Sequence, residues 1–284
     1  MFSVFSAALG FMNNSATRTV TEFYLLGFPH CQKLQSFLFL LFFGVYIFTT
    51  MGNGTIICPV RLDQWLHTPT YLLLGNFAFL EIWHITSTVP NMLVNIFSET
   101  KSISFVGCFL QLYFLASLAR TESYFLCIMA YDLYLAICRP LHYTTVMTQR
   151  LCYILMSLCW VFGFLSYSVS TVQLSQLPFC GPNTIDHFVC DMDPLIALSC
   201  APAPVTEIIF YVLNSLIIIL TLLYILSSYS LLLIAVLKVP SATDQQKAFS
   251  TCGSHLTVVC LFFGAPLQCM WPRQLITQLK CIRL

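Results

Sequence analysis

Six long apolar blocks dominate the sequence and constrain the fold more than any other feature. A helix that crosses a membrane needs roughly 20 mostly apolar residues, and each of these blocks is about that long or longer. Only 8% of the 284 residues are charged, whereas a soluble domain carries about 25%. The sequence therefore predicts an all-α fold, a polytopic transmembrane helix bundle. The six predicted spans cover about residues 35–60, 69–97, 105–137, 151–172, 205–237 and 251–270.

The charge balance of the chain is close to neutral. Twelve Lys and Arg residues and eleven Asp and Glu residues leave a formal net charge of +1, which is too small a basic excess for a nucleic-acid-binding protein. Membrane lipid is therefore a predicted partner, and nucleic acid is not. No G-x-S-x-G, H-E-x-x-H or phosphate-binding loop occurs in the sequence. We therefore expect no enzyme activity, no catalytic residue and no cofactor.

The distribution of Lys and Arg predicts that the N-terminus lies outside the cell. The first, third and fifth connections between the spans carry five cations, whereas the N-terminal segment and the second and fourth connections carry three. Membrane proteins keep the more cationic connections in the cytoplasm. A glycosylation sequon at Asn13 agrees with this orientation. Residues 1–34 are therefore predicted to form an extracellular N-terminus.

Four cysteines are predicted to lie on the outer side of the membrane. Cys180, Cys190 and Cys200 fall in the long fourth connection, and Cys108 begins the third span. Extracellular cysteines are usually oxidised, but four thiols allow three pairings, and the sequence alone does not choose among them. Zinc binding is the alternative. It is disfavoured because the loop contains no C-x-x-C pair and a single histidine, so no metal site is predicted.

Ionisable residues lie near the middle of two predicted spans, where charge is costly and usually functional. Glu81 is in the second span, and Arg120 and Glu122 are in the third. Residues two apart on a helix point in different directions, so we expect Glu81 to pair with Arg120 or Glu122 across the helices. Three roles remain open for them: a buried cluster that joins helices, a cation site between two carboxylates, or a charge that faces a ligand cavity. His84 and His255 also lie within spans and are expected to have polar partners in the core.

Four motifs distributed along residues 12–272 carry a close resemblance to one family. They are Gly52-Asn53, the stretch LHTPTY at 66–71, the stretch MAYDLYLAIC at 129–138 with PLHY at 140–143, and the stretch KAFSTCGSHL at 247–256. These stretches resemble the motifs of the olfactory receptors, which are rhodopsin-like G-protein-coupled receptors. The resemblance implies a rhodopsin-like receptor fold over residues 35–272. It also implies an odorant receptor of the plasma membrane that binds small volatile ligands and couples to a heterotrimeric G protein of the olfactory stimulatory type.

The resemblance further implies roles for individual residues. Cys108 is expected to pair with Cys190, and Cys180 with Cys200. Glu81 occupies the position at which related receptors bind sodium, and Glu122 matches an acidic residue common in the family, so the two form a candidate ion site. If Arg120 faces the ligand cavity, odorants that carry a carboxylate are favoured. The residues expected to line the odorant cavity between the third, fifth and sixth helices are Leu115, Ala116, Ala119, Arg120, Val259 and Phe263.

Two features depart from the family pattern. The G-protein-coupling motif D-R-Y reads Asp132-Leu133-Tyr134 here, and leucine offers neither the charge nor the hydrogen bonds of arginine. After residue 272 the family continues into a seventh span, whereas residues 273–284 form a divergent tail that is too short to cross a membrane.

Two alternatives to a signalling odorant receptor follow from these observations. The first is a truncated, signalling-silent relative that is retained in the endoplasmic reticulum or acts only by associating with intact receptors. The second is a small transporter or channel, which is disfavoured because the halves of the sequence show no repeats. The usual family start corresponds to Met12, so the protein is expected to begin at either Met1 or Met12.

Overall fold

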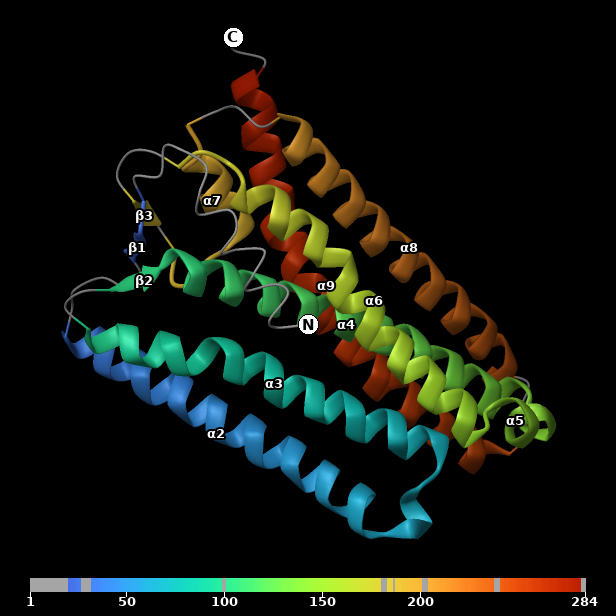
Figure 1. Cartoon of the computed structure of the whole chain (residues 1–284). Helices are drawn as coiled ribbons and strands as arrows, with labels where there is room; N and C mark the ends of the chain where they lie inside the picture. Colours follow the sequence, from blue (N-terminus) through green and yellow to red (C-terminus); the bar gives the residue numbers. More distant parts are fainter. Residues whose placement is uncertain are drawn as a thin grey trace. The chain divides into compact units, whose positions relative to one another are not determined.

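A computed structural model of the chain consists mainly of long helices, with a small β-sheet (Figure 1). The structure describes residues 20–26, 32–98, 101–179, 183–185, 187–200, 204–237 and 241–281, and within the last helix it describes side chains as far as residue 264. The predicted glycosylation site Asn13 and the cysteine Cys180 lie outside these ranges.

Six helices have 27 residues or more, and each overlaps one predicted span. They are α2 (Gln32–Leu62), α3 (Pro69–Phe97), α4 (Phe105–Cys138), α6 (Gln149–Ser175), α8 (Pro204–Leu237) and α9 (Ala242–Cys281). The shorter elements of the described chain are β1 (Glu22–Leu25), η2 (Gln64–Leu66), β2 (Ser102–Ser104), α5 (Pro140–Val146), β3 (Thr184–Ile185) and α7 (Met192–Ala197).

Four of the long helices are long and apolar enough to cross a membrane. Their apolar stretches, found among the described residues, are Lys33–Leu62, Pro69–Phe97, Gln149–Ser175 and Phe210–Leu237. The sequence of α4 is interrupted by Arg120, Glu122 and Asp132, and the apolar part of α9 is the shorter segment Ala248–Gly264. The predicted helical membrane bundle agrees with these helices, while the count of six spans stays a prediction.

The ends of α9 differ from the predicted sixth span. The helix begins at Ala242, nine residues before the predicted start, because its first two turns are polar and so carry no apolar signal. It continues to Cys281, through most of the segment that was predicted as a divergent tail. The predicted boundary at residue 272 therefore falls inside a helix, and the division of the chain into domains stays a prediction.

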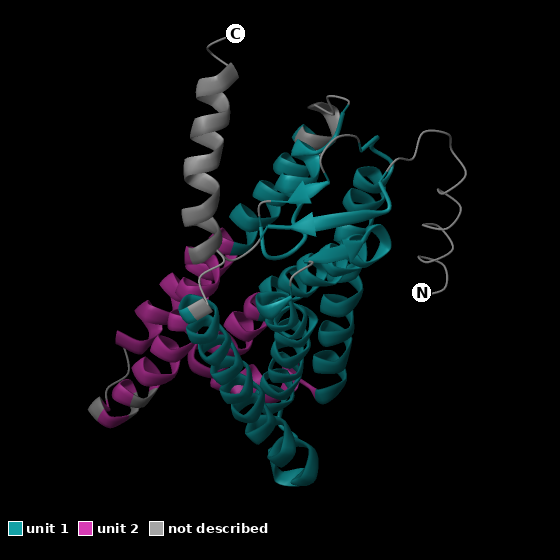
Figure 2. Ribbon diagram, turned by 90° about the vertical axis from the view of Figure 1, so that its left-hand side faces the viewer, with its two compact units in different colours: residues 1–125, 149–221 teal, residues 126–148, 222–284 magenta. Residues whose placement is uncertain are grey.

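The chain divides into two compact units, which Figure 2 shows in teal and magenta. Unit 1 comprises Met1–Phe125 and Gln149–Thr221, and it contains α2, α3, α6, the sheet, α7 and the first parts of α4 and α8. Unit 2 comprises Leu126–Thr148 and Leu222–Leu284, and it contains α5, α9 and the remaining parts of α4 and α8.

A three-stranded sheet in unit 1 joins three segments that are far apart in the sequence. β1 is central, antiparallel to β2 and parallel to β3. These strands belong to the N-terminal segment and to the second and fourth connections, which were predicted to share the outer side. The sequence did not predict this small sheet in the otherwise helical fold. Strands of two to four residues that pair over such separations leave no alternating pattern to detect.

A buried aromatic cluster and a disulfide attach this sheet to the start of α4. Phe23 of β1 is 1% exposed, and its ring lies 5.8 Å from the rings of both Phe105 and Phe179. Cys108 and Cys190, both fully buried, form the disulfide that the resemblance implied. Together they hold the fourth connection against the first turn of α4.

Cys200 is also disulfide-bonded. Its expected partner, Cys180, lies outside the described residues, so the second pairing stays a prediction.

Inside unit 1, α6 approaches α4 very closely at Gly163. A Cβ atom added to Gly163 would lie 2.0 Å from Oγ1 of Thr121 and 3.1 Å from its Cα. Thr121 is fully buried, and its hydroxyl donates to the carbonyl of Ser117 at 2.8 Å. Only glycine permits this backbone separation.

Replacement of Gly163 by alanine should lower the melting temperature of the purified protein in detergent micelles. The new methyl group meets the backbone of α4, which cannot move aside as a flexible side chain can, and overpacking of this kind costs about 1–3 kcal/mol. Gly44→Ala in α2 is the control, because no other atom lies within 4 Å of its Cβ position. A Gly163→Ala protein as stable as the control would contradict the close approach.

Replacement of Cys108 by serine should also destabilise the fold. The Cys108–Cys190 bond links positions 82 residues apart, and loss of a bond that closes a long loop typically costs about 2–4 kcal/mol. Thermal unfolding under non-oxidising handling measures the effect. Cys58→Ser is the matched control, since Cys58 is a free and exposed thiol. Equal losses in the two variants would show that the bond contributes nothing to stability.

Candidate functional site

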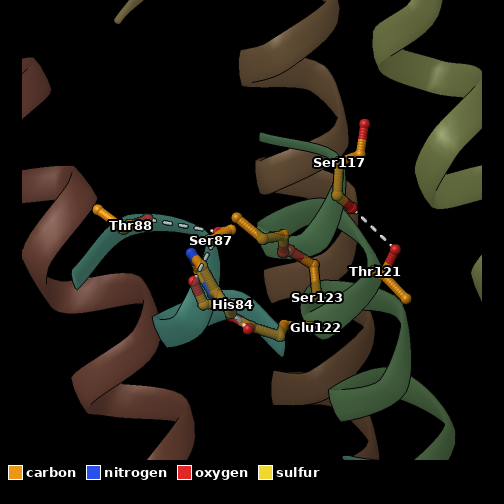
Figure 3. A network of polar contacts seen from close by, with 8 residues as sticks. His84, Ser87, Thr88, Ser117, Thr121, Glu122 and Ser123 are labelled. Carbon is orange, nitrogen blue, oxygen red and sulfur yellow. Dashed lines mark hydrogen bonds and ion pairs between the residues drawn. The ribbon is translucent and has the colours of Figure 1, made fainter. Parts of the chain in front are cut away.

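A short polar contact joins α3 to α4 within unit 1 (Figure 3). Nδ1 of His84 lies 2.5 Å from Oε1 of Glu122, and the Glu122 side chain is 3% exposed. The prediction that Glu81 pairs with Arg120 or Glu122 was therefore wrong, whereas the expected polar partner of His84 is present. Glu81 precedes His84 by one helical turn and acts on the pair only electrostatically. Two carboxylates repel each other, so the imidazole is the better partner for Glu122.

The hydroxyl groups around this pair bond to their own helices. Ser87 Oγ donates to the carbonyl of His84 at 2.7 Å, and Ser123 Oγ donates to the carbonyl of Ala119 at 3.1 Å. Figure 3 shows these hydroxyls on α3 and α4 beside His84 and Glu122. Because the hydroxyls are engaged elsewhere, the imidazole is the group that satisfies Glu122. Among the described residues, no group of three or more metal-ligating side chains is found.

Arg120 contacts a different helix. Its guanidinium donates to Oδ1 of Asn214 on α8, and the residue is only 9% exposed. Arg120 and Glu122 thus point to different neighbours, as their spacing of two residues predicts. No motif marks Asn214 in the sequence; its only signal is a polar residue inside the otherwise apolar stretch of α8.

Further polar groups of unit 1 lie near Arg120 and α7. The hydroxyl of Tyr211 on α8 donates to Oδ1 of Asp193 at 2.7 Å. Asp191 caps α7 by accepting from the backbone N–H of Met192 at 2.7 Å. The hydroxyl of Tyr167 on α6 interacts electrostatically with Asp191, Arg120 and Asp193. These tyrosines were not identified from the sequence, because aromatic residues are common in apolar spans.

The residues expected to line an odorant cavity are divided between the two units. On α4, in unit 1, Leu115, Ala116 and Ala119 are half-buried, and Arg120 is buried. Val259 and Phe263 lie on α9 in unit 2, where both are buried. Their common cavity therefore stays a prediction.

The D-R-Y position lies in unit 2, where the partly buried Leu133 packs against apolar side chains. Leu133 packs against the buried cluster of Leu232, Val236 and Cys252 from α8 and α9. The neighbouring Asp132 is 4% exposed and accepts a hydrogen bond from the hydroxyl of Tyr143 on α5 at 2.8 Å. Leucine at this position thus adds to the packing of three helices.

His255 of α9 also has the polar partner that was expected. The hydroxyl of Tyr229 on α8 lies 2.6 Å from Nδ1 of His255, and the two rings stack with an interplanar angle of 17°. The same hydroxyl lies 3.3 Å from the carbonyl of Cys252. This contact joins α8 to α9 beside the cluster that holds Leu133.

Separate replacements of His84 by phenylalanine and Glu122 by leucine should each destabilise the protein. Removal of one partner leaves the other as an unpaired buried charge or polar group, which costs about 3–5 kcal/mol. The double variant should lose less than the sum of the single losses, because neither unpaired group remains. Thermal unfolding of the four proteins measures the coupling. The exposed His142, replaced by phenylalanine, is the control. If the stability loss of the double variant equalled the sum of the two single losses, His84 and Glu122 would not form a direct pair.

Comparison with known proteins identifies the family. Residues 42–275 match the family model described as olfactory receptor. Human olfactory receptor 11H4 is 63% identical over 262 residues, which cover 92% of this chain and 81% of that protein. Human olfactory receptor 11H7 is 61% identical over 254 residues, or 89% of this chain and 81% of that protein. Human olfactory receptor 11H6 is 60% identical over 262 residues, which cover 92% of this chain and 79% of that protein. The chain therefore belongs to the olfactory receptors, a family of rhodopsin-like G-protein-coupled receptors, which makes it a multi-pass membrane protein and not an enzyme.

Proposed function

We propose that this chain is an odorant receptor that detects small volatile ligands and signals through a heterotrimeric G protein. The observation that carries this proposal is the match of most of the chain to the olfactory receptors. Within the chain, Arg120 and Asn214 form a polar contact between α4 and α8. A few polar groups in apolar surroundings are typical of small-ligand sites.

The proposed ligand site consists of the residues that the family resemblance implies. Apolar side chains contribute contact area for a volatile molecule, and the guanidinium contributes one strong, directional donor group. The site residues are Leu115, Ala116, Ala119, Arg120, Val259 and Phe263. For the extracellular side of the membrane, the family resemblance and the sequon lead us to propose glycosylation at Asn13 and a disulfide bond between Cys180 and Cys200.

The proposed G protein is of the olfactory stimulatory type, and the proposed location is the plasma membrane, where lipid surrounds the helices. Asp132, Leu133 and Tyr134 occupy the coupling motif. A candidate cation site at Glu81 and Glu122 is less favoured, because His84 already pairs with Glu122.

A second candidate is a signalling-silent relative, retained in the endoplasmic reticulum or acting through intact receptors. It is favoured by one observation, the packing of the partly buried Leu133 against apolar side chains where the family carries arginine. A leucine supplies no charge or hydrogen bond to a G protein. The two candidates therefore differ in what happens after an odorant binds.

Odorant-stimulated cyclic AMP in cells that express the chain together with the olfactory stimulatory G protein tests the proposal. We expect surface labelling of an N-terminal epitope on intact cells, and a cyclic AMP rise above that of vector-only cells for at least one member of a panel of volatile acids, alcohols, aldehydes and ketones. Human olfactory receptor 11H4 serves as the control for surface expression. Surface labelling without any response would favour the signalling-silent relative, and labelling only after permeabilisation would favour retention.

A further inference from the structure

The connection between α2 and α3 presents two large apolar side chains on its surface. Leu62, the last residue of α2, is 84% exposed, and Trp65 of η2 is 90% exposed. The two helices that this connection joins lie side by side in unit 1 (Figure 1). Burial of a large apolar side chain is favourable by about 1.5–3 kcal/mol, so this surface would be stabilised by contact with an apolar partner.

Hydrogen bonds fix the position of Trp65 within the connection. Oδ1 of Asp63 accepts from the backbone N–H of Trp65 at 2.9 Å, and the carbonyl of Asp63 accepts from the N–H of Leu66 at 3.1 Å. The side-chain amide of Gln149, at the start of α6, donates to the carbonyl of His67 at 2.8 Å. The connection is thus folded and attached to α6, and it holds the indole away from the protein.

The shortness of the connection keeps this surface at the boundary of the membrane. The stretches Lys33–Leu62 and Pro69–Phe97 are both long and apolar enough to cross a membrane, and only residues 63–68 separate them. The first stretch is a helix about 45 Å long, whereas the hydrocarbon core is about 30 Å thick. The end of α2 therefore reaches the headgroup layer, where the tryptophans of membrane proteins are enriched. A lipid surface is the partner that this position offers.

Two exposed arginines flank this surface. Arg61 lies in the last turn of α2, and Arg150 lies in the first turn of α6, next to Gln149. Neither guanidinium forms an ion pair with a residue that the structure describes. The carboxylate of Asp63, which is closest in sequence to Arg61, accepts the N–H of Trp65. A guanidinium binds phosphate through parallel N–H···O bonds, so the arginines add a preference for anionic headgroups.

We propose that Arg61, Leu62, Trp65 and Arg150 form an interfacial surface that binds anionic phospholipids. Leu62 and Trp65 insert between the headgroups, and the two guanidiniums bind phosphate groups of neighbouring lipids. The distribution of Lys and Arg predicts that this connection is cytoplasmic, and the cytoplasmic leaflet is the one that carries anionic lipids such as phosphatidylserine. This lipid site is additional to the proposed odorant function and does not depend on it.

Quenching of Trp65 fluorescence by brominated lipids tests the inference. The full chain is placed in phosphatidylcholine nanodiscs that contain increasing mole fractions of either brominated phosphatidylserine or brominated phosphatidylcholine. The chain has four tryptophans, so the difference between wild type and Trp65→Phe isolates the emission of Trp65. We expect the quenching slope against mole fraction to be at least about threefold steeper for phosphatidylserine, because arginines near the surface attract anionic lipid.

Three variants, each measured with its own Trp65→Phe counterpart, locate the charge recognition. Arg61→Gln and Arg150→Gln should each lower the ratio of the two slopes by about half, and the double variant should bring the ratio close to one. Lys33→Gln is the matched control, because it removes an exposed positive charge at the opposite end of α2 and should leave the ratio unchanged. Thermal unfolding in the same nanodiscs checks that each variant is folded.

Three results would overturn the inference. Emission of Trp65 that neither brominated lipid quenches would show that the connection lies away from the membrane. Equal slopes for the two lipids in wild type would show a lipid contact without a preference for anionic headgroups. A ratio that stays unchanged in the double variant would place the preference outside Arg61 and Arg150. None of these results bears on odorant-stimulated cyclic AMP, so the proposed function is tested separately.

Discussion

Three consecutive residues of α4 contact three different helices, and the arrangement of unit 1 depends on them. Arg120 bonds to Asn214 of α8, Thr121 lies against Gly163 of α6, and Glu122 pairs with His84 of α3. Successive residues of an α-helix point about 100° apart, because 3.6 residues make one turn. One turn of α4 can therefore hold α3, α6 and α8 around it. A rotation of α4 by one residue would break all three contacts together.

The three residues differ in whether each polar side chain has a matching partner within the protein. This difference distinguishes the residues with a structural role from the residue with a candidate binding role. Thr121 donates to its own helix, and Glu122 is matched by His84, so both are complete within the protein. Among the described residues, the hydrogen-bond partner of Arg120 is the neutral amide of Asn214. In a medium without water, groups that are paired within the protein hold helices together, whereas an ionisable group without a charged partner is usually functional. The same turn of α4 thus combines a structural role with a candidate binding role.

The helices of this fold could be predicted from the sequence, but the contacts between them could not. The second predicted span, 69–97, coincides with α3, since Pro69 begins the helix and the apolar run has no break. The partners of Arg120 and Glu122 were missed because lipid-facing sides are as apolar as buried ones, so the pattern does not reveal which way a helix is turned. The Cys108–Cys190 pairing followed from family resemblance, whereas the sheet was missed because its strands are two to four residues long.

Unit 2 is held by a different kind of interaction from unit 1. Leu133 packs on Leu232, Val236 and Cys252, and the nearby Asp132 accepts a hydrogen bond from Tyr143. No ion pair joins the described residues of this unit. Separation of these helices therefore exposes apolar area of the cluster. Apolar contacts are not directional, so nothing in this cluster favours one arrangement of the helices as strongly as a charged pair would. A receptor that must switch between two arrangements needs differential contacts in each, and the leucine offers the same contact chemistry in both. If the proposed odorant receptor signals, its coupling to a G protein therefore has to proceed without the charge that an arginine would supply at position 133.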